Sequence, residues 1–186
     1  GTVAALGLSR PHMPFKGTIM AILISPMIVP LIITAAGMFF FYSKVGLTHS
    51  YLGLILAHTA LGTPFVVITV TATLTGFDTN LIRASQSLGA DTLRTFFKVI
   101  MPLILPGVIS GALFAFITSF DEVVVVLFIG SIEQVTIPKQ MWAGLRQETS
   151  PVILSMATCL VLLSIALLTT VELLRRRSER LRGIKV

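Results

Sequence analysis

The strongest indication of the fold class is the uncharged stretch VIMPLILPGVISGALFAFITSF at residues 99–120. It contains 22 residues, and a helix that crosses a bilayer needs about 20 mostly apolar residues. We therefore predict a membrane span here, with bounds of about 99–122 that reach an acidic pair at its end.

Three further apolar runs of comparable length lie at residues 19–42, 51–74 and 149–172. Prolines interrupt these runs and the first stretch, among them Pro26, Pro30, Pro64, Pro102 and Pro106. Membrane helices tolerate proline where neighbouring helices satisfy the freed backbone groups. The pattern therefore predicts an all-α integral membrane protein, a polytopic helix bundle that forms a single transmembrane domain over residues 1–186. Because the sequence opens at Gly1 in an apolar segment, we expect one or more N-terminal spans to precede it.

The composition agrees with a membrane protein and excludes two other classes. Hydrophobic residues make up 54% of the 186 residues and charged residues only 12%, whereas soluble domains carry about 25% charged residues. Disordered chains are rich in charge and poor in apolar residues, so disorder is excluded as well. The net charge of +6 comes from basic residues outside the apolar runs, which favours membrane topology over nucleic-acid binding. The single cysteine, Cys159, is interpreted as a small buried hydrophobic residue.

Lysine and arginine fall mainly on one side of the predicted membrane. With four spans, the connecting segments alternate between the two sides. Eleven basic residues lie on one side: Arg10, Lys16, Arg83, Arg94, Lys98, Arg175, Arg176, Arg177, Arg180, Arg182 and Lys185. Three lie on the other side: Lys44, Lys139 and Arg146. The positive-inside rule predicts that residues 78–100 and the C-terminus are cytoplasmic, and that residues 43–50 and 131–148 face outward.

The segment at residues 78–100 is too polar to span a membrane and too periodic to be irregular. Apolar residues recur at helical spacing in two short pieces: Leu81, Ala84 and Leu88, then Leu93, Phe96, Phe97 and Ile100. Gly89 lies between the pieces, where a left-handed glycine would end the first helix, and Asp91 can cap the second. This predicts a helix–turn–helix, either an amphipathic hairpin at the lipid interface or a docking element for a partner.

The same segment resembles the EAA loop of permease subunits of ABC transporters. The family pattern is Glu-Ala-Ala, three residues, Gly, nine residues, then Ile-x-Leu-Pro. This sequence has Arg83-Ala84-Ser85, Gly89 and then Val99-Ile100-Met101-Pro102 at the same spacing. The resemblance implies a coupling loop that docks on an ATPase. Its residues would be Arg83, Ala84, Ser85, Gly89, Val99 and Pro102.

Four positions depart from the family pattern. Arg83 replaces the glutamate, and because this reverses a charge, no ion pair of that glutamate can be transferred to this chain. Ser85, Val99 and Met101 replace the second alanine, the isoleucine and the leucine. Ala84, Gly89 and Pro102 keep the pattern.

Sequences further along resemble one branch of this family, the second permease subunit of spermidine/putrescine transporters. The resemblance is carried by residues 119–129, which begin SFDE, by IPKQMW at residues 137–142 and by QETSPV at residues 147–152. It implies a fold like that of type I ABC importer permeases, and it covers essentially the whole chain. The solute that it implies is small and cationic, of the polyamine class.

The resemblance also implies a set of partners. We expect two ATP-binding cassette ATPases, a second homologous permease, an extracytoplasmic solute-binding protein and the lipid of a bacterial inner membrane. The chain has no G-x-x-x-x-G-K-[ST] phosphate loop, so ATP and Mg²⁺ would be bound by the ATPase and this chain would need no cofactor. It also has no H-E-x-x-H, C-x-x-C or G-x-S-x-G motif, so no catalytic or metal residue and no enzyme activity is expected.

Asp121 and Glu122 are the only charges between residues 99 and 132. One straight helix over that stretch would measure about 51 Å, which exceeds a hydrocarbon core of about 30 Å. We therefore predict a bend or break near the pair. Carboxylates at this depth usually face a watery cavity, so we expect a translocation-path role, with Asp121 rather than Glu122 facing the path. The alternative is a pair that is hydrated at the outer interface, or paired with Lys139 or Arg146.

A repeat of small residues and one histidine are interpreted as packing positions. Gly107, Gly111 and Ala115 recur every four residues, and we interpret them as close helix packing. His58 is interpreted as a packed, hydrogen-bonded histidine rather than a proton relay.

The alternative functions are an ABC permease for another solute, such as an opine or amino acid, an aminophosphonate or ferric iron, and a secondary transporter or channel.

Overall fold

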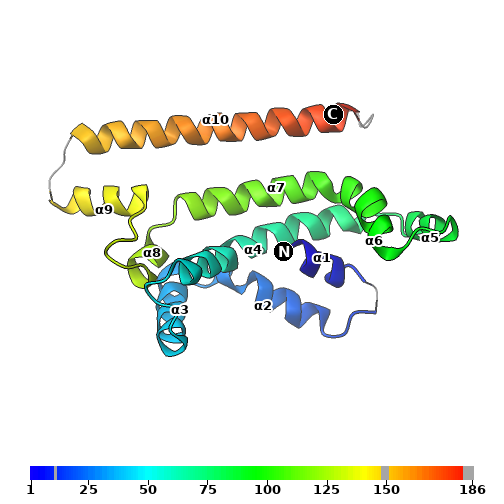
Figure 1. Cartoon of the computed structure of the whole chain (residues 1–186), viewed down its shortest axis with the longest axis horizontal. Helices are drawn as coiled ribbons and strands as arrows, with labels where there is room; N and C mark the ends of the chain where they lie inside the picture. The colour runs from blue at the N-terminus through cyan, green and yellow to red at the C-terminus, as the bar shows by residue number, and fades with distance from the viewer. Residues whose placement is uncertain (11, 148–150, 182–186) are drawn as a thin grey trace.

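The computed structural model describes residues 1–10, 12–147 and 151–181, and this part is built of helices and short connections (Figure 1). The elements in chain order are α1 Thr2–Leu8, α2 Lys16–Ile28, α3 Leu31–Val45, α4 Tyr51–Thr75, α5 Asn80–Ser87, α6 Thr92–Thr95, the π-helical turn η1 Phe96–Ile100, α7 Met101–Phe120, α8 Val124–Ile129, α9 Ile137–Gln147 and α10 Pro151–Leu181. The prediction of an all-helical chain is confirmed for the described residues.

Helices α4 and α7 form the centre of the bundle, with α1 and α2 against α4 and with α10 along α7 (Figure 1). Small residues allow the close approach of the central pair. A β-carbon added at Gly62 would lie 2.9 Å from the β-carbon of Ala115, and one added at Gly111 would lie 2.7 Å from the Cα of Val66. The interpretation of the glycine repeat on α7 as helix packing is therefore confirmed.

The predicted span at residues 19–42 is not one straight helix. The structure divides it into α2 and α3, whose axes differ by 108°. Pro30 has no N–H to continue α2, and its ring disfavours the helical conformation at Val29, which is extended at φ −71° and ψ 136°. Pro26, by contrast, is accommodated inside α2.

Within the described residues, three helical stretches are long and apolar enough to cross a membrane. They are Tyr51–Thr75, Thr92–Phe120 and Pro151–Thr170. The bent pair of α2 and α3 makes a fourth when it is counted as one span. The first two positions of the predicted span at 149–172 lie outside the described residues.

Helix α10 corrects one interpretation. Cys159 is exposed on it rather than buried. The reason is that α10 contacts the rest of the described chain mainly through α7 and α9 and leaves apolar side chains such as Leu162 exposed. The side chains of Arg175, Arg176, Arg177 and the basic residues beyond them lie outside the described part.

The break predicted near the acidic pair is confirmed. Helix α7 ends with Asp121 as its C-terminal capping residue, and α8 begins at Val124 in a new direction (Figure 1). The turn between them is held by Glu122, whose Oε1 accepts a hydrogen bond of 2.8 Å from the Val125 N–H. This arrangement places α3, α8 and α9 at one end of the bundle and α5 and α6 at the other.

Candidate functional site

The hairpin of α5 and α6 forms at the position that its local sequence predicts. Gly89 has φ +83° and follows the end of α5, where its N–H donates to the Gln86 carbonyl and the Ala90 N–H donates to the Ser85 carbonyl. This is the Schellman arrangement, which favours glycine at the left-handed position. Asp91 caps α6 by accepting a hydrogen bond of 2.7 Å from the Arg94 N–H. Both local predictions are confirmed.

The hairpin is joined rigidly to the central bundle. The hydroxyl oxygens of Ser85 and Thr95 lie 3.0 Å apart and connect α5 to α6. Helix α6 then continues through η1 into α7 without a break, and the Met101 N–H donates to the Phe96 carbonyl, five residues back. Pro102 explains the π-helical turn, because its missing N–H and its ring disturb the normal bonding to residue 98.

The outer surface of the hairpin is apolar. Leu88 is 88% exposed and Leu93 is 68% exposed, and Leu81 and Phe97 are exposed beside them. A groove of about 470 Å³ runs past Gly89, Asp91, Leu93, Arg94, Phe97 and Lys98. Exposed apolar side chains grouped in this way mark an interaction surface.

The six residues predicted for the coupling loop fall into two groups. Arg83, Ala84 and Gly89 are exposed and Ser85 is half-buried, and all four belong to α5 and its turn. Val99 and Pro102 lie instead at the joint with α7, where both are half-buried. The structure therefore assigns the second group to the connection between hairpin and bundle.

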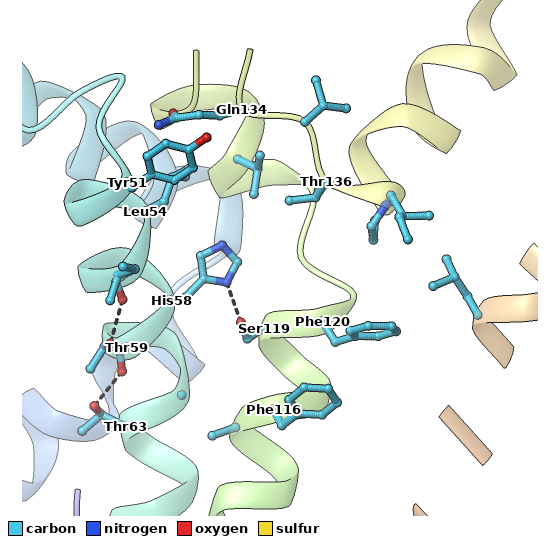
Figure 2. Close-up of a pocket in the computed structure, with 18 of the residues that line it drawn as sticks. Tyr51, Leu54, His58, Thr59, Thr63, Phe116, Ser119, Phe120, Gln134 and Thr136 are labelled. Atoms are coloured by element: carbon cyan, nitrogen blue, oxygen red, sulfur yellow. Dashed lines mark hydrogen bonds between the residues drawn. The ribbon is translucent and has the colours of Figure 1, made fainter. Parts of the chain in front are cut away.

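A cavity of about 800 Å³ lies between α4, α7 and the segment at residues 133–138 (Figure 2). Its wall is mainly apolar and aromatic, with Tyr51, Phe116 and Phe120, and it includes the hydroxyl groups of Thr59 and Thr63. His58 Nδ1 and Ser119 Oγ are 2.8 Å apart and join α4 to α7 within it. The interpretation of His58 as a hydrogen-bonded histidine is confirmed.

The two carboxylates are not equivalent. Glu122 is 6% exposed and lies within electrostatic range of His58, while Asp121 is exposed and lines a second cavity of about 320 Å³ between α7 and α10. Neither residue belongs to the wall of the larger cavity as the described residues define it. The two successive residues therefore have different surroundings.

Lys139 donates hydrogen bonds to backbone carbonyls rather than to the acidic pair, Asp121 and Glu122. Its ammonium group donates to the backbone carbonyls of Ser131, at 2.9 Å, and Gln134, at 3.1 Å. The alternative in which Lys139 pairs with Asp121 or Glu122 is therefore wrong. The side chain of Arg146 lies outside the described part.

The larger cavity was not predicted from the sequence. His58 and Ser119 are separated by 61 positions, and the threonines look like ordinary polar positions in an apolar run. The available signal was the four-residue spacing of Thr59 and Thr63, which places two hydroxyl groups on one face of the helix. Among the described residues, no group of three or more His, Cys, Asp or Glu side chains is placed to hold a metal ion.

Comparison with known proteins gives a consistent result. The sequence profile of the family described as "Binding-protein-dependent transport system inner membrane component" matches residues 1–180. The spermidine/putrescine transport system permease protein PotC of Haemophilus influenzae is 30% identical over 179 residues, which are 96% of this chain and 70% of that protein. The putrescine transport system permease protein PotI of Escherichia coli K12 is 29% identical over an alignment of 171 residues. The alignment covers 87% of this chain and 60% of that protein.

The fold also has a solved counterpart. A chain of the MetNI methionine ABC transporter, in inward-facing conformations, superposes with a TM-score of 0.73. The two chains are 22% identical, and the match covers 95% of this chain and 84% of that one. The prediction of a permease fold like that of type I ABC importers is confirmed.

Proposed function

We propose, since the chain belongs to the family of binding-protein-dependent transport system inner membrane components, that it passes a polyamine across the membrane. The chain is a membrane-spanning permease subunit of an ABC importer. Such a permease works with an ATPase and a solute-binding protein. The proposal concerns the solute, the residues that act on it and the way this chain contacts its partners.

The observation that carries the coupling proposal is the exposed apolar hairpin that continues into α7. Leu88 and Leu93 offer apolar area to a groove on the ATPase, and Ala84 and Gly89 allow close approach. Because α6, η1 and α7 form one continuous stretch, a displacement of the hairpin moves the central helix pair. ATP and Mg²⁺ belong to the ATPase in this scheme, and Arg83 pairs with one of its acidic groups.

The assembly has two faces in this proposal. The hairpin and the C-terminal end of α10 lie at one end of the bundle, and α8 and α9 lie at the other (Figure 1). We assign the first end to the cytoplasm of a bacterial cell and the second to the binding protein. A second, homologous permease completes the path, and the ATPase is a dimer.

The polyamine proposal has two independent supports. Relatives at about 30% identity are named for spermidine and putrescine transport. Within this chain, Asp121 and Glu122 are the only two charges of the stretch from Val99 to Ile132, and they lie at the break between α7 and α8. Two negative charges at this depth favour a cationic solute, because carboxylates inside a membrane face an aqueous path or an opposite charge.

The test is uptake by the assembled transporter in proteoliposomes with its own binding protein. We expect uptake of radiolabelled spermidine or putrescine, and we expect methionine, an aminophosphonate and ferric iron to be excluded. Asp121→Asn and Glu122→Gln keep the side-chain size and remove the charge, so each should lower uptake while assembly is retained. Uptake of an uncharged or anionic solute, or unchanged polyamine uptake by both variants, would contradict the polyamine proposal.

A further inference from the structure

The ring of His58 is held in one orientation in the larger cavity. Its Nδ1 lies 2.8 Å from Ser119 Oγ, so the hydrogen bond fixes the ring between α4 and α7. Figure 2 shows the second ring nitrogen, Nε2, on the side away from Ser119, toward the segment that carries Gln134 and Thr136. The described residues provide no hydrogen-bond partner for Nε2.

The chemistry of Nε2 follows from the bond at Nδ1. A neutral imidazole carries one N–H donor and one acceptor nitrogen. The 2.8 Å contact fits either tautomer, because the Ser119 hydroxyl can donate or accept. We assign the tautomer in which Nδ1–H donates to Ser119, so that Nε2 is an acceptor with a lone pair that faces the cavity. An acceptor in this position requires a donor from outside the chain.

The surroundings of His58 select the kind of donor. Tyr51, Phe116 and Phe120 line the same cavity and offer faces that attract both methylene chains and ammonium groups. The carboxylate of Glu122 follows Ser119 three positions later in the chain, with its Oε1 engaged by the Val125 N–H. A donor that is also a cation, with an aliphatic chain, satisfies all three features.

We infer that His58 Nε2 accepts a hydrogen bond from an ammonium group of the solute as the solute passes the cavity. This inference rests on the proposed function, because it gives the polyamine a contact inside the permease. It makes His58 a specificity-determining residue and Ser119 its positioning residue. A histidine that only joins the two helices would need Nδ1 and would have no use for Nε2.

Two substitutions of His58 separate these roles. The amide of asparagine reaches the position of Nδ1, so His58→Asn keeps the bridge to Ser119 and removes the group at Nε2. The longer glutamine reaches the position of Nε2, so His58→Gln keeps an acceptor there and gives up the bridge. Ser119→Ala removes the bridge and leaves the imidazole intact.

The measurement is the number of spermidine molecules taken up per ATP hydrolysed, in proteoliposomes that contain the whole transporter and saturating loaded binding protein. Hydrogen bonds to charged groups are among the stronger ones, so we expect His58→Asn to lower this ratio by about tenfold. We expect His58→Gln and Ser119→Ala to stay within about threefold of the unchanged protein.

Other outcomes overturn the inference. A ratio that is unchanged in His58→Asn shows that Nε2 has no contact with the solute. Retention in His58→Asn with loss in the other two variants, or equal loss in all three, assigns the effect to the bridge. If the unchanged transporter takes up no polyamine but takes up another solute, the proposed function fails instead, and the two failures are thereby distinguished.

A variant pair covers the case in which His58→Asn does not assemble. His58→Ala in a Ser119→Ala background is compared with Ser119→Ala alone, so the bridge is absent from both. A further fall in spermidine per ATP of about tenfold supports the inference. An equal ratio in the two proteins overturns it.

Discussion

The hydroxyl groups of Ser85 and Thr95 meet at 3.0 Å and join α5 to α6, the two helices of the hairpin. Thr95 is 2% exposed, while Ser85 is half-buried. The two partners therefore differ in what they lose when the other is removed. A buried hydroxyl without a partner is costly, whereas a half-buried one can turn to water.

The first prediction uses this asymmetry. Ser85→Ala leaves the buried Thr95 hydroxyl unpaired and should lower stability by about 1–3 kcal/mol. Thr95→Val keeps the shape of the buried side chain and should have a smaller effect, since Ser85 remains hydrated. The measurement is the thermal unfolding of the purified transporter, together with ATP hydrolysis stimulated by the binding protein. A larger loss in Thr95→Val than in Ser85→Ala would contradict this account of the contact.

The second prediction concerns Gly89. For a tryptophan at this position, the β-carbon meets no atom within 4 Å and the side chain starts in open space. Its effects are therefore a left-handed backbone penalty of about 1–2 kcal/mol and a collision with whatever docks there. We expect Gly89→Trp to abolish stimulated ATP hydrolysis while the protein still inserts and assembles with the second permease.

Gly46 provides the matched control for Gly89. It also has a positive φ, +71°, and its β-carbon would meet no atom within 4 Å, but it ends α3 at the opposite end of the bundle. Gly46→Trp carries the same backbone penalty, and because it lies at the end assigned to the binding protein, the two variants are compared by co-purification of the ATPase, which Gly46→Trp should retain and Gly89→Trp should lose. Equal losses in the two variants would assign the effect to strain and remove the case for docking at Gly89.

The third prediction concerns the packing of α4 against α7. A β-carbon at Gly111 would press on the Thr69 hydroxyl and the Val66 backbone, so Gly111→Ala should destabilise the bundle by about 1–3 kcal/mol. Gly37 on α3 has no atom within 4 Å of the same position, and Gly37→Ala should be neutral or stabilising by up to about 1 kcal/mol. Thermal unfolding in detergent compares the two. Equal melting temperatures would show that the close approach does not contribute to stability.

The sequence predicts the features that depend on neighbouring residues. The hairpin is an example, because Gly89 and Asp91 act through hydrogen bonds that close within a few positions. The break after α7 is another, since the length of the apolar run exceeds the thickness of a bilayer. The packing of Gly111 follows from its spacing to Gly107, without knowledge of which helix lies opposite.

Other features depend on contacts between distant segments and could not be predicted. The bend between α2 and α3 requires a choice between two prolines, and only Pro30 produces it, because Pro26 is absorbed within a helix. The cavity requires the pairing of α4 with α7, which brings His58 to Ser119. The burial of Glu122 accompanies the packing of α8 against α3 and α4, which the pattern of charges does not contain.

The fourth prediction tests the orientation in the membrane. After Cys159, which is exposed, is replaced by alanine, single cysteines are placed at Ile132 and Thr92. Ile132 is 94% exposed near α8, and Thr92 is exposed at the start of α6. A maleimide that cannot cross membranes should label Ile132→Cys in intact cells and should label Thr92→Cys only after lysis. The opposite pattern would invert the proposed topology.

The last prediction concerns Lys139, which holds together the segment that borders the larger cavity. Its ammonium group donates to the carbonyls of Ser131 and Gln134. Two further hydrogen bonds close the same turn: the Ser131 N–H donates to Gln134 Oε1 at 2.9 Å, and the Gln134 N–H donates to Ser131 Oγ at 3.2 Å. The turn is therefore a preformed wall of the cavity, and Lys139 supplies its charged donor.

Lys139→Met keeps the length of the side chain and removes all three donors. Because hydrogen bonds from a charged group contribute about 1.5–3 kcal/mol, we expect the backbone amides of residues 131–136 to exchange with deuterium about tenfold faster or more. Lys44→Met is the control, since Lys44 is exposed in the last turn of α3 and its loss removes the same charge. It should leave exchange in this segment unchanged. Equal acceleration in both variants would mean that net charge, rather than the two carbonyl contacts of Lys139, holds the wall in place.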